Sequence, residues 1–202
     1  NEIELYNQSS RVNFYARQRI VEFVDTDYVK KTEFKTDSFA VRIQGVNLDA
    51  PRNFCLKVMP AEDYEASPEL QLADKYTFSA LDTVCQTYYY RVKRPELKRG
   101  NKAFGCLVAF DQANPNHQFD KGLVERNQML VNVRWQLRPY NWDEGDWGEY
   151  SDAKYIYMMD VLGKDYSQLT YDDFDTVSKA YEAYLAAGKP AIVDDKGTPI
   201  SF

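Results

Sequence analysis

The sequence has few of the residues that usually build metal centres and catalytic triads. Its 202 residues include three cysteines and one histidine, His117. A structural zinc site needs four Cys or His ligands at short spacings, and no CxxC pair occurs. A lone histidine in a loop is more often a surface residue than a general base. Glycine-rich nucleotide loops, HExxH helices and GxSxG elbows are also missing. We therefore expect no cofactor, no metal and no catalytic residue.

The chain also lacks an excess of basic residues and any long hydrophobic run. Lys and Arg number 25 against 31 Asp and Glu, which gives a formal net charge of −6. Affinity for a phosphate backbone comes mostly from clustered Lys and Arg, so the composition argues against a nucleic-acid partner. No apolar run approaches the roughly 20 residues that cross a bilayer. Membrane contact is therefore not predicted from the chain itself.

The three cysteines, Cys55, Cys85 and Cys106, lie in apolar or alternating runs. A free cysteine in such a setting behaves as a small buried hydrophobe. The odd number leaves at least one thiol unpaired in a monomer. The pattern favours three reduced, buried thiols, and one disulfide between Cys55 and Cys106 is the alternative.

Residues 1–138 have the pattern of a mainly β domain. Short runs rich in β-branched and aromatic residues recur between Pro, Asp, Asn and Gly. The predicted strands are 11–15, 38–46, 53–59, 76–81, 85–94, 103–111 and 128–137. About seven such strands predict an immunoglobulin-like two-sheet β-sandwich. The polar segment 112–127 is predicted to be a long loop.

Alternation within these runs predicts which side chains face the core. In the run 85–94, Tyr88 and Tyr90 share one face, and Tyr89 lies on the other. At least one of these two faces is expected to be core. In the other runs the same rule gives three core faces: Phe39, Val41 and Ile43; Phe104, Cys106, Val108 and Phe110; and Val131, Val133, Trp135 and Leu137.

Residues 139–202 are predicted to form a small C-terminal helical lobe. Ser151 is the expected N-cap of one helix and Gly163 its stop. The apolar residues between them, at helical spacing, are Tyr155, Met158, Met159 and Leu162. The lobe is too small to bury two amphipathic stripes alone, so we expect it to pack on the sandwich.

A second helix and a closing hairpin complete the predicted lobe. Thr170 is the expected cap of this helix, and Gly188 and Pro190 end it. Its apolar stripe comprises Phe174, Val177, Tyr181 and Leu185, and we expect the whole stripe to be buried. The turn at 194–197 predicts a small terminal hairpin.

The segment 140–150, predicted as a loop, combines aromatic and acidic side chains. Trp142, Trp147 and Tyr150 are the candidate ligand-binding residues, because such rings stack on sugars and anchor peptides. The pattern favours the alternative, in which the same rings pack between sandwich and lobe.

The acidic residues of this region are Asp143, Glu144, Asp146, Glu149 and Asp152. Their spacing does not match a calcium loop. Two of them could form the carboxylate pair of a hydrolase, but a solvated acidic loop is the favoured interpretation.

The order of motifs resembles an uncharacterised family of Bacteroidetes lipoproteins, a domain of unknown function encoded near SusC/SusD-like import pairs. The resemblance covers nearly the whole chain and departs from the family at 82–85. The matching motifs are VNF at 12–14, VRIQG at 41–45, RNF at 52–54, WGEYS at 147–151, KY at 154–155, Met158, LG at 162–163, GKP at 188–190, DD at 194–195, Gly197 and ISF at 200–202.

This resemblance implies a location and partners rather than a chemistry. Such proteins are lipid-anchored accessory proteins of the outer membrane, facing the surface or the periplasm and tethered by an acylated cysteine upstream of this segment. No functional residue carries over from the family. The leading hypothesis is a non-enzymatic lipoprotein that assists nutrient capture, of a glycan or a peptide, beside SusC/SusD-like outer-membrane proteins. The alternatives are a carboxylate-pair hydrolase at the sandwich–lobe junction and a structural adaptor of an import complex.

Overall fold

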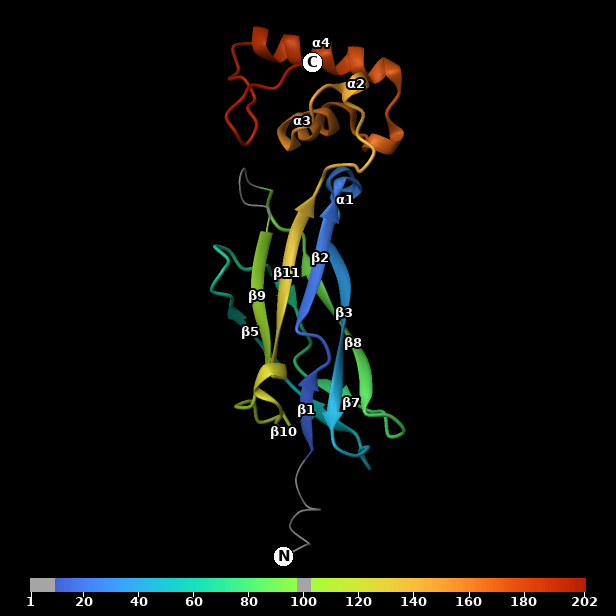
Figure 1. Cartoon of the computed structure of the whole chain (residues 1–202), viewed down its shortest axis with the longest axis vertical. Helices are drawn as coiled ribbons and strands as arrows, with labels where there is room; N and C mark the ends of the chain where they lie inside the picture. Colours follow the sequence, from blue (N-terminus) through green and yellow to red (C-terminus); the bar gives the residue numbers. More distant parts are fainter. Residues whose placement is uncertain (1–9, 98–102) are drawn as a thin grey trace, which may run out of the picture. The chain divides into compact units, whose positions relative to one another are not determined.

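The computed structural model describes residues 10–97 and 103–202, which form two compact units (Figure 1). The first unit is a mainly β, immunoglobulin-like sandwich and includes Glu33–Pro95 and Ala103–Arg134. The second unit is helical and includes Glu22–Thr32 and Trp135–Phe202. The sequence-based boundary at residue 138 assigned Glu22–Thr32 to the sandwich, whereas this segment groups with the C-terminal helices.

Two main sheets make up the sandwich. One sheet has the strand order β10-β1-β3-β8-β6, and the other has the order β2-β11-β9-β5, three strands of which lie side by side in Figure 1. Strands β4 and β7 form a separate pair. The strands are β1 (Arg11–Phe14), β2 (Gln18–Val24), β3 (Phe34–Gln44), β4 (Arg52–Phe54), β5 (Leu56–Pro60), β6 (Leu70–Gln71), β7 (Tyr76–Phe78), β8 (Cys85–Lys93), β9 (Ala103–Phe110), β10 (Asp120–Lys121) and β11 (Gln128–Gln136).

The predicted core faces are confirmed by the burial of their side chains. Tyr88 and Tyr90 are buried, whereas Tyr89 between them is 64% exposed. The three faces predicted in 38–46, 103–111 and 128–137 are buried throughout. Stacking of Phe14 on Phe110, with 4.3 Å between ring centroids, joins the two sheets. Period-2 alternation was therefore a sufficient guide to these faces of the core.

Three features of the β region differ from the sequence prediction. Strands β2 and β6, and the helix α1 (Asp25–Lys30) that follows β2, were not predicted. The predicted strand 53–59 is two strands, because β4 pairs with β7 and β5 pairs with β9. The predicted loop 112–127 contains β10, which pairs in parallel with β1.

His117 has a structural role in that loop. It is half-buried, and its Nδ1 accepts a hydrogen bond of 3.0 Å from the backbone N–H of Cys55. Burial lowers the pKa of the imidazole. The side chain therefore fixes the break between β4 and β5, rather than lying on the surface as predicted.

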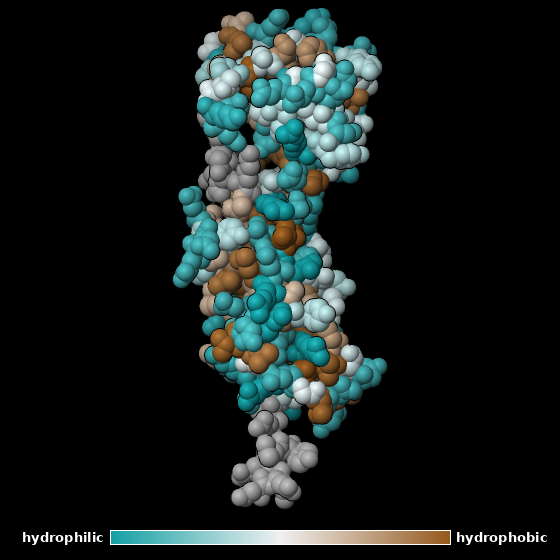
Figure 2. Space-filling view, in the orientation of Figure 1, coloured by the Kyte–Doolittle hydropathy of each residue, from teal (hydrophilic) through white to brown (hydrophobic). Residues whose placement is uncertain are grey.

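The surface of the sandwich does not gather its hydrophobic residues on the face in view. Figure 2 shows brown groups separated by hydrophilic teal residues along this unit. Isolated exposed apolar side chains are normal for soluble proteins. This face therefore gives no indication of a docking surface.

All three cysteines are free, as predicted, but their burial differs. Cys55 and Cys106 are buried, and Cys85 is half-buried rather than buried. Burial raises the pKa of the Cys55 thiol and raises that of Cys106 to about 11. The thiolate is the reactive species. Cys55 and Cys106 are therefore protected from thiol reagents both by their burial and by their raised pKa.

We expect a thiol reagent such as DTNB at pH 8 to modify at most Cys85 in the native protein and all three cysteines after denaturation without reductant. The Cys85→Ser variant is the control and should show no native reaction. Fewer than three thiols after unfolding would reveal a disulfide and contradict the assignment. Rapid native modification of Cys106 would contradict its burial.

The helical unit contains α1, α2 (Glu144–Trp147), α3 (Asp152–Leu162) and α4 (Tyr171–Ala186). The predicted caps of the two longer helices are confirmed: the Ser151 hydroxyl accepts from the N–H of Lys154, and Thr170 begins α4 in a capping box with Asp173. Gly163 ends α3 with φ 64°. A bridge between Val193 and Pro199 closes the predicted terminal hairpin.

The predicted burial of the whole α4 stripe is wrong for two of its four residues. Val177 and Tyr181 are buried, but Phe174 is only half-buried and Leu185 is 43% exposed. The chain after α4 returns over Tyr181, whose hydroxyl accepts from the N–H of Ile192, while the Tyr184 hydroxyl donates to the carbonyl of Pro190. The last turn is therefore covered on its Tyr184 side, and Leu185 is left facing solvent.

Candidate ligand pocket

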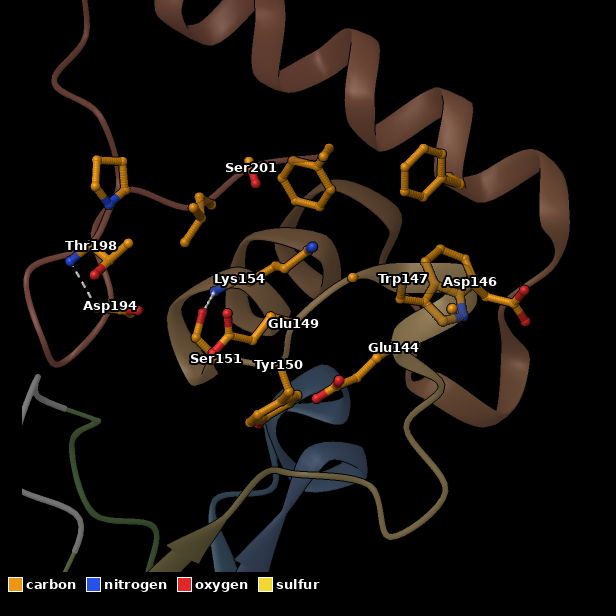
Figure 3. A pocket seen from close by; sticks show the side chains of 16 residues that line it. Glu144, Asp146, Trp147, Glu149, Tyr150, Ser151, Lys154, Asp194, Thr198 and Ser201 are labelled. Carbon is orange, nitrogen blue, oxygen red and sulfur yellow. Dashed lines mark hydrogen bonds between the residues drawn. The ribbon is translucent and has the colours of Figure 1, made fainter.

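A pocket of about 340 Å³ lies within the helical unit (Figure 3). Its walls come from α2 and the segment after it, the first turn of α3, the start of α4, and the terminal hairpin. The lining residues are Glu144, Gly145, Asp146, Trp147, Gly148, Glu149, Tyr150, Ser151, Lys154, Phe174, Asp194, Thr198, Pro199, Ile200, Ser201 and Phe202. We call this site the Lys154 pocket.

Local sequence explains how the α2 wall is built. The carboxylate of Asp143 caps α2 by accepting hydrogen bonds from the N–H groups of Gly145 and Asp146. Gly148 ends this short helix with φ 79°, a left-handed value that favours glycine. A Cβ atom on Gly148 would lie 2.8 Å from Nζ of Lys154. Glycine here therefore allows both the turn and the space for the ammonium. The segment predicted as a loop thus contains a capped helical turn.

Lys154 is the central polar group of the pocket. The residue is 5% exposed, and its Nζ lies 5.0 Å from the centroid of the Phe202 ring. Burial lowers the pKa of this ammonium, while the charge of Glu149 opposes that effect. In Figure 3 the amine points into the pocket, and the dashed line to Ser151 is made by the backbone N–H of Lys154, not by its side chain.

Aromatic rings form the apolar part of the lining. Trp147 is 7% exposed and packs against Phe174, with 6.0 Å between the ring centroids. Phe202 adds a half-buried ring from the terminal hairpin. Tyr150 is held by a 2.5 Å hydrogen bond from its hydroxyl to Asp152 and by the Arg138 guanidinium over its ring. Burial, together with Asp152, raises the pKa of the Tyr150 hydroxyl.

The structure separates the three predicted binding residues. Trp147 and Tyr150 line the Lys154 pocket, and Trp142 does not. Trp142 stacks on Tyr166 at 5.4 Å, contacts Tyr150 edge-on at 5.0 Å, and donates its indole N–H to the carbonyl of Gly148. It therefore supports the pocket wall from behind.

Lys154, Phe174 and Phe202 line the pocket but were not predicted as site residues. One signal was available for the lysine. Lys154 lies four residues before Met158 and next to Tyr155, on the predicted apolar face of α3. A charged residue inside such a stripe predicts either a buried partner or a functional group.

Acidic side chains surround the mouth of the Lys154 pocket. Glu144, Asp146, Glu149 and Asp194 all belong to its lining, and the first three are exposed. Carboxylates accept hydrogen bonds and do not donate them when ionised. Across residues 10–97 and 103–202, no three His, Cys, Asp or Glu side chains are grouped as metal ligands would be. The mouth is therefore suited to ligands that carry hydrogen-bond donors such as hydroxyl groups.

Comparison with known proteins shows similarity of structure only. No protein-family model matches the chain, and no curated protein matches it. The apo CBD1 domain of Calx is similar to 64% of this chain over 99% of its own length, with 9% identity and a TM-score of 0.42. A proposed carbohydrate-binding protein from Bacteroides ovatus matches 61% of this chain and 36% of its own, with 13% identity and a TM-score of 0.43.

A Bacteroides thetaiotaomicron protein, EndoBT-3987 with a Man5GlcNAc product, matches 61% of this chain and 30% of its own, with 10% identity and a TM-score of 0.38. At these TM-scores the similarities carry no inference about function. No helix in the described part of the chain is long and apolar enough to cross a membrane.

Proposed function

We propose that the helical unit is a non-enzymatic binding module that captures a soluble saccharide in the Lys154 pocket. The pocket itself is the observation that carries this proposal. Small-ligand sites are concave, have volumes from about 300 Å³ upward, and combine an apolar lining with a few converging polar groups. The Lys154 pocket has a volume of about 340 Å³ and combines four aromatic rings with the amine of one buried lysine.

The polar groups at the mouth favour a saccharide over a peptide. Sugar hydroxyls donate hydrogen bonds in several directions, and the carboxylates of Glu144 and Glu149 accept them. The hydroxyl of Ser201 both donates and accepts. A peptide backbone offers one donor per residue and places it at fixed intervals. A ring with several hydroxyl groups therefore matches this mouth better.

The sequence resemblance supplies the proposed setting. We propose that the chain is a lipid-anchored accessory protein of the outer membrane, which assists nutrient capture beside SusC/SusD-like proteins. Membrane contact would come only from the upstream lipid anchor. In this setting the binding unit presents a saccharide to the import machinery and does not alter it.

We expect a panel of oligosaccharides and short peptides, titrated by isothermal calorimetry, to contain a saccharide that binds the protein. Phe202→Ala should weaken that binding by at least about tenfold, because aromatic residues contribute disproportionately to binding. Tyr171→Ala removes an aromatic ring that is 85% exposed and does not line the pocket, so it is the matched control.

The two variants separate the possible outcomes. Equal weakening by Phe202→Ala and Tyr171→Ala, or binding of peptides alone, would contradict the proposal. Hydrolysis of a panel member, lost in Glu149→Gln, would instead support the carboxylate-pair hydrolase. Co-purification of import proteins with no saccharide affinity at all would support the structural adaptor.

A further inference from the structure

We infer that the Lys154 pocket selects saccharides that carry a carboxylate, and that the Lys154 ammonium binds this group. The inference deepens the proposed function and rests on it. It names the ligand class, an acidic sugar, and the side chain that discriminates it from a neutral one.

The burial of an unpartnered amine is the first observation. Lys154 is 5% exposed, yet among residues 10–97 and 103–202 its ammonium makes no hydrogen bond and no ion pair. The nearest charge that acts on it is Glu149, which is exposed. Lysines are almost never this buried unless they are paired. The partner of this lysine is therefore expected to come from outside the chain.

The energetics of burying the Lys154 amine favour an anionic ligand. Burying an ammonium removes hydration that only a charge or strong acceptor replaces. Contact with the Phe202 ring at 5.0 Å offsets part of this cost through a cation–π interaction. Burial lowers the pKa of the Lys154 ammonium, the direction expected for a charge without a close ionic partner. A bound carboxylate would replace the lost hydration of the ammonium through a charge-assisted hydrogen bond.

The charge of the lining decides which anion fits. Lys154 is the single basic residue of the lining, against four acidic ones, Glu144, Asp146, Glu149 and Asp194. The exposed carboxylates are screened by water and salt more strongly than the amine of the largely buried Lys154. Close to Lys154 the attraction to an anion therefore dominates. A doubly charged phosphate would also approach the acidic rim, so one ammonium matches one carboxylate best.

The position of Lys154 also places the rest of the ligand. Its amine projects toward the interior of the pocket, while Glu149 and Glu144 lie below it in Figure 3 and Asp194 lies farther away, beside Thr198. A carboxylate on the amine would leave the sugar ring near Phe202 and the hydroxyls toward these acceptors. Both halves of an acidic sugar thus meet complementary groups.

The test compares two probes that differ in one group. Methyl β-D-glucuronide carries a carboxylate where methyl β-D-glucoside carries a hydroxymethyl group. We expect the wild-type protein to bind the glucuronide about tenfold to a hundredfold more tightly, as a charge-assisted hydrogen bond allows. Lys154→Met keeps the length of the side chain and should abolish this preference.

Lys189→Met is the matched control. Lys189 also places its Nζ over a ring, 5.3 Å from the Tyr184 centroid, but it is exposed and outside the pocket. This variant should keep the full preference for the glucuronide. Thermal unfolding of both variants checks that the fold is retained, and a destabilised Lys154→Met would be replaced by Lys154→Gln.

The outcomes separate this inference from the proposed function. Equal affinity for the two probes, with binding still sensitive to Phe202→Ala, would overturn the inference and leave saccharide binding intact. Failure of every saccharide would overturn both. Preference for methyl glucoside 6-sulfate, or for an acetylated tripeptide with a free carboxylate, would overturn the assignment to an acidic sugar.

Discussion

Replacing Tyr155 with alanine is expected to lower the free energy of unfolding of the helical unit by about 3–5 kcal/mol, the usual cost of deleting a buried aromatic side chain. Tyr155 is 0% exposed and lies on the buried face of α3. Its ring contacts Trp142 at 5.7 Å and Tyr150 at 6.2 Å between centroids. Such a loss is a large part of the stability of an ordinary domain.

The hydroxyl of Tyr155 contributes separately from its ring. It donates to Asp25 at 2.7 Å and accepts from the N–H of Tyr166 at 2.7 Å, so it joins α1 to the segment after α3. Burial and the neighbouring Asp25 raise the pKa of this hydroxyl. Tyr155→Phe removes this hydroxyl and leaves Asp25 and the N–H of Tyr166 without their hydrogen-bond partner. We therefore expect the free energy of unfolding to fall by about 1–3 kcal/mol.

Tryptophan fluorescence is the measurement for this series. All three tryptophans, Trp135, Trp142 and Trp147, belong to the helical unit, so their emission reports its unfolding. Tyr171→Ala removes an exposed tyrosine of α4 and should leave the urea midpoint unchanged. A midpoint for Tyr155→Ala within error of this control would show that α1 and the Trp142 wall are not part of one cooperative unit. If Tyr155→Phe and Tyr155→Ala lower the free energy of unfolding equally, the whole effect comes from the lost hydrogen bonds and not from the ring.

The features predicted correctly from the sequence are those set by nearby residues. Alternation placed Val131 and Val133 in the core because strand side chains alternate between faces. Ser151 and Gly163 bounded α3 because capping and left-handed backbone geometry are local. Strand β2 was missed although Val21 and Phe23 alternate, because charged residues interrupt so short a run.

The features that could not be predicted depend on distant residues. Helix α1 groups with the C-terminal helices through Tyr155–Asp25 and through the Tyr28 hydroxyl, which donates to Asp160 at 2.6 Å. These pairs are separated by 130 and 132 positions in the sequence. The Lys154 pocket combines α2 with a hairpin about fifty residues later, and only the folded chain brings Phe202 over Lys154.

Phe54→Ala is expected to have a comparable effect on the sandwich, with a loss of about 3–5 kcal/mol in its free energy of unfolding. Phe54 is 0% exposed and is the last residue of β4, the short strand that belongs to neither main sheet. Its ring stacks on Tyr76 at 5.3 Å and meets Tyr88 edge-on at 4.9 Å. It also meets Phe110 edge-on at 5.8 Å.

These partners explain why one side chain should matter so much. Tyr88 belongs to the sheet that contains β8, Phe110 belongs to the sheet that contains β9, and Tyr76 belongs to β7. Phe54 therefore contacts all three sheets at once, and each aromatic pair adds about 0.5–1.5 kcal/mol beyond simple burial. Close-packed interiors relax only partly around such a cavity.

The measurement for Phe54 is urea unfolding followed by the β signal in far-UV circular dichroism, because the sandwich unit contains none of the tryptophans. Tyr89→Ala is the matched control, since Tyr89 is 64% exposed on β8 and its neighbours Tyr88 and Tyr90 carry the core contacts. Phe54→Leu restores most of the volume without the ring, so it should recover part of the loss. If Phe54→Ala and Tyr89→Ala unfold at the same urea concentration, the small β4–β7 sheet does not contribute to the stability of the sandwich. The contact between the two main sheets would then depend on the Phe14–Phe110 stack and not on Phe54.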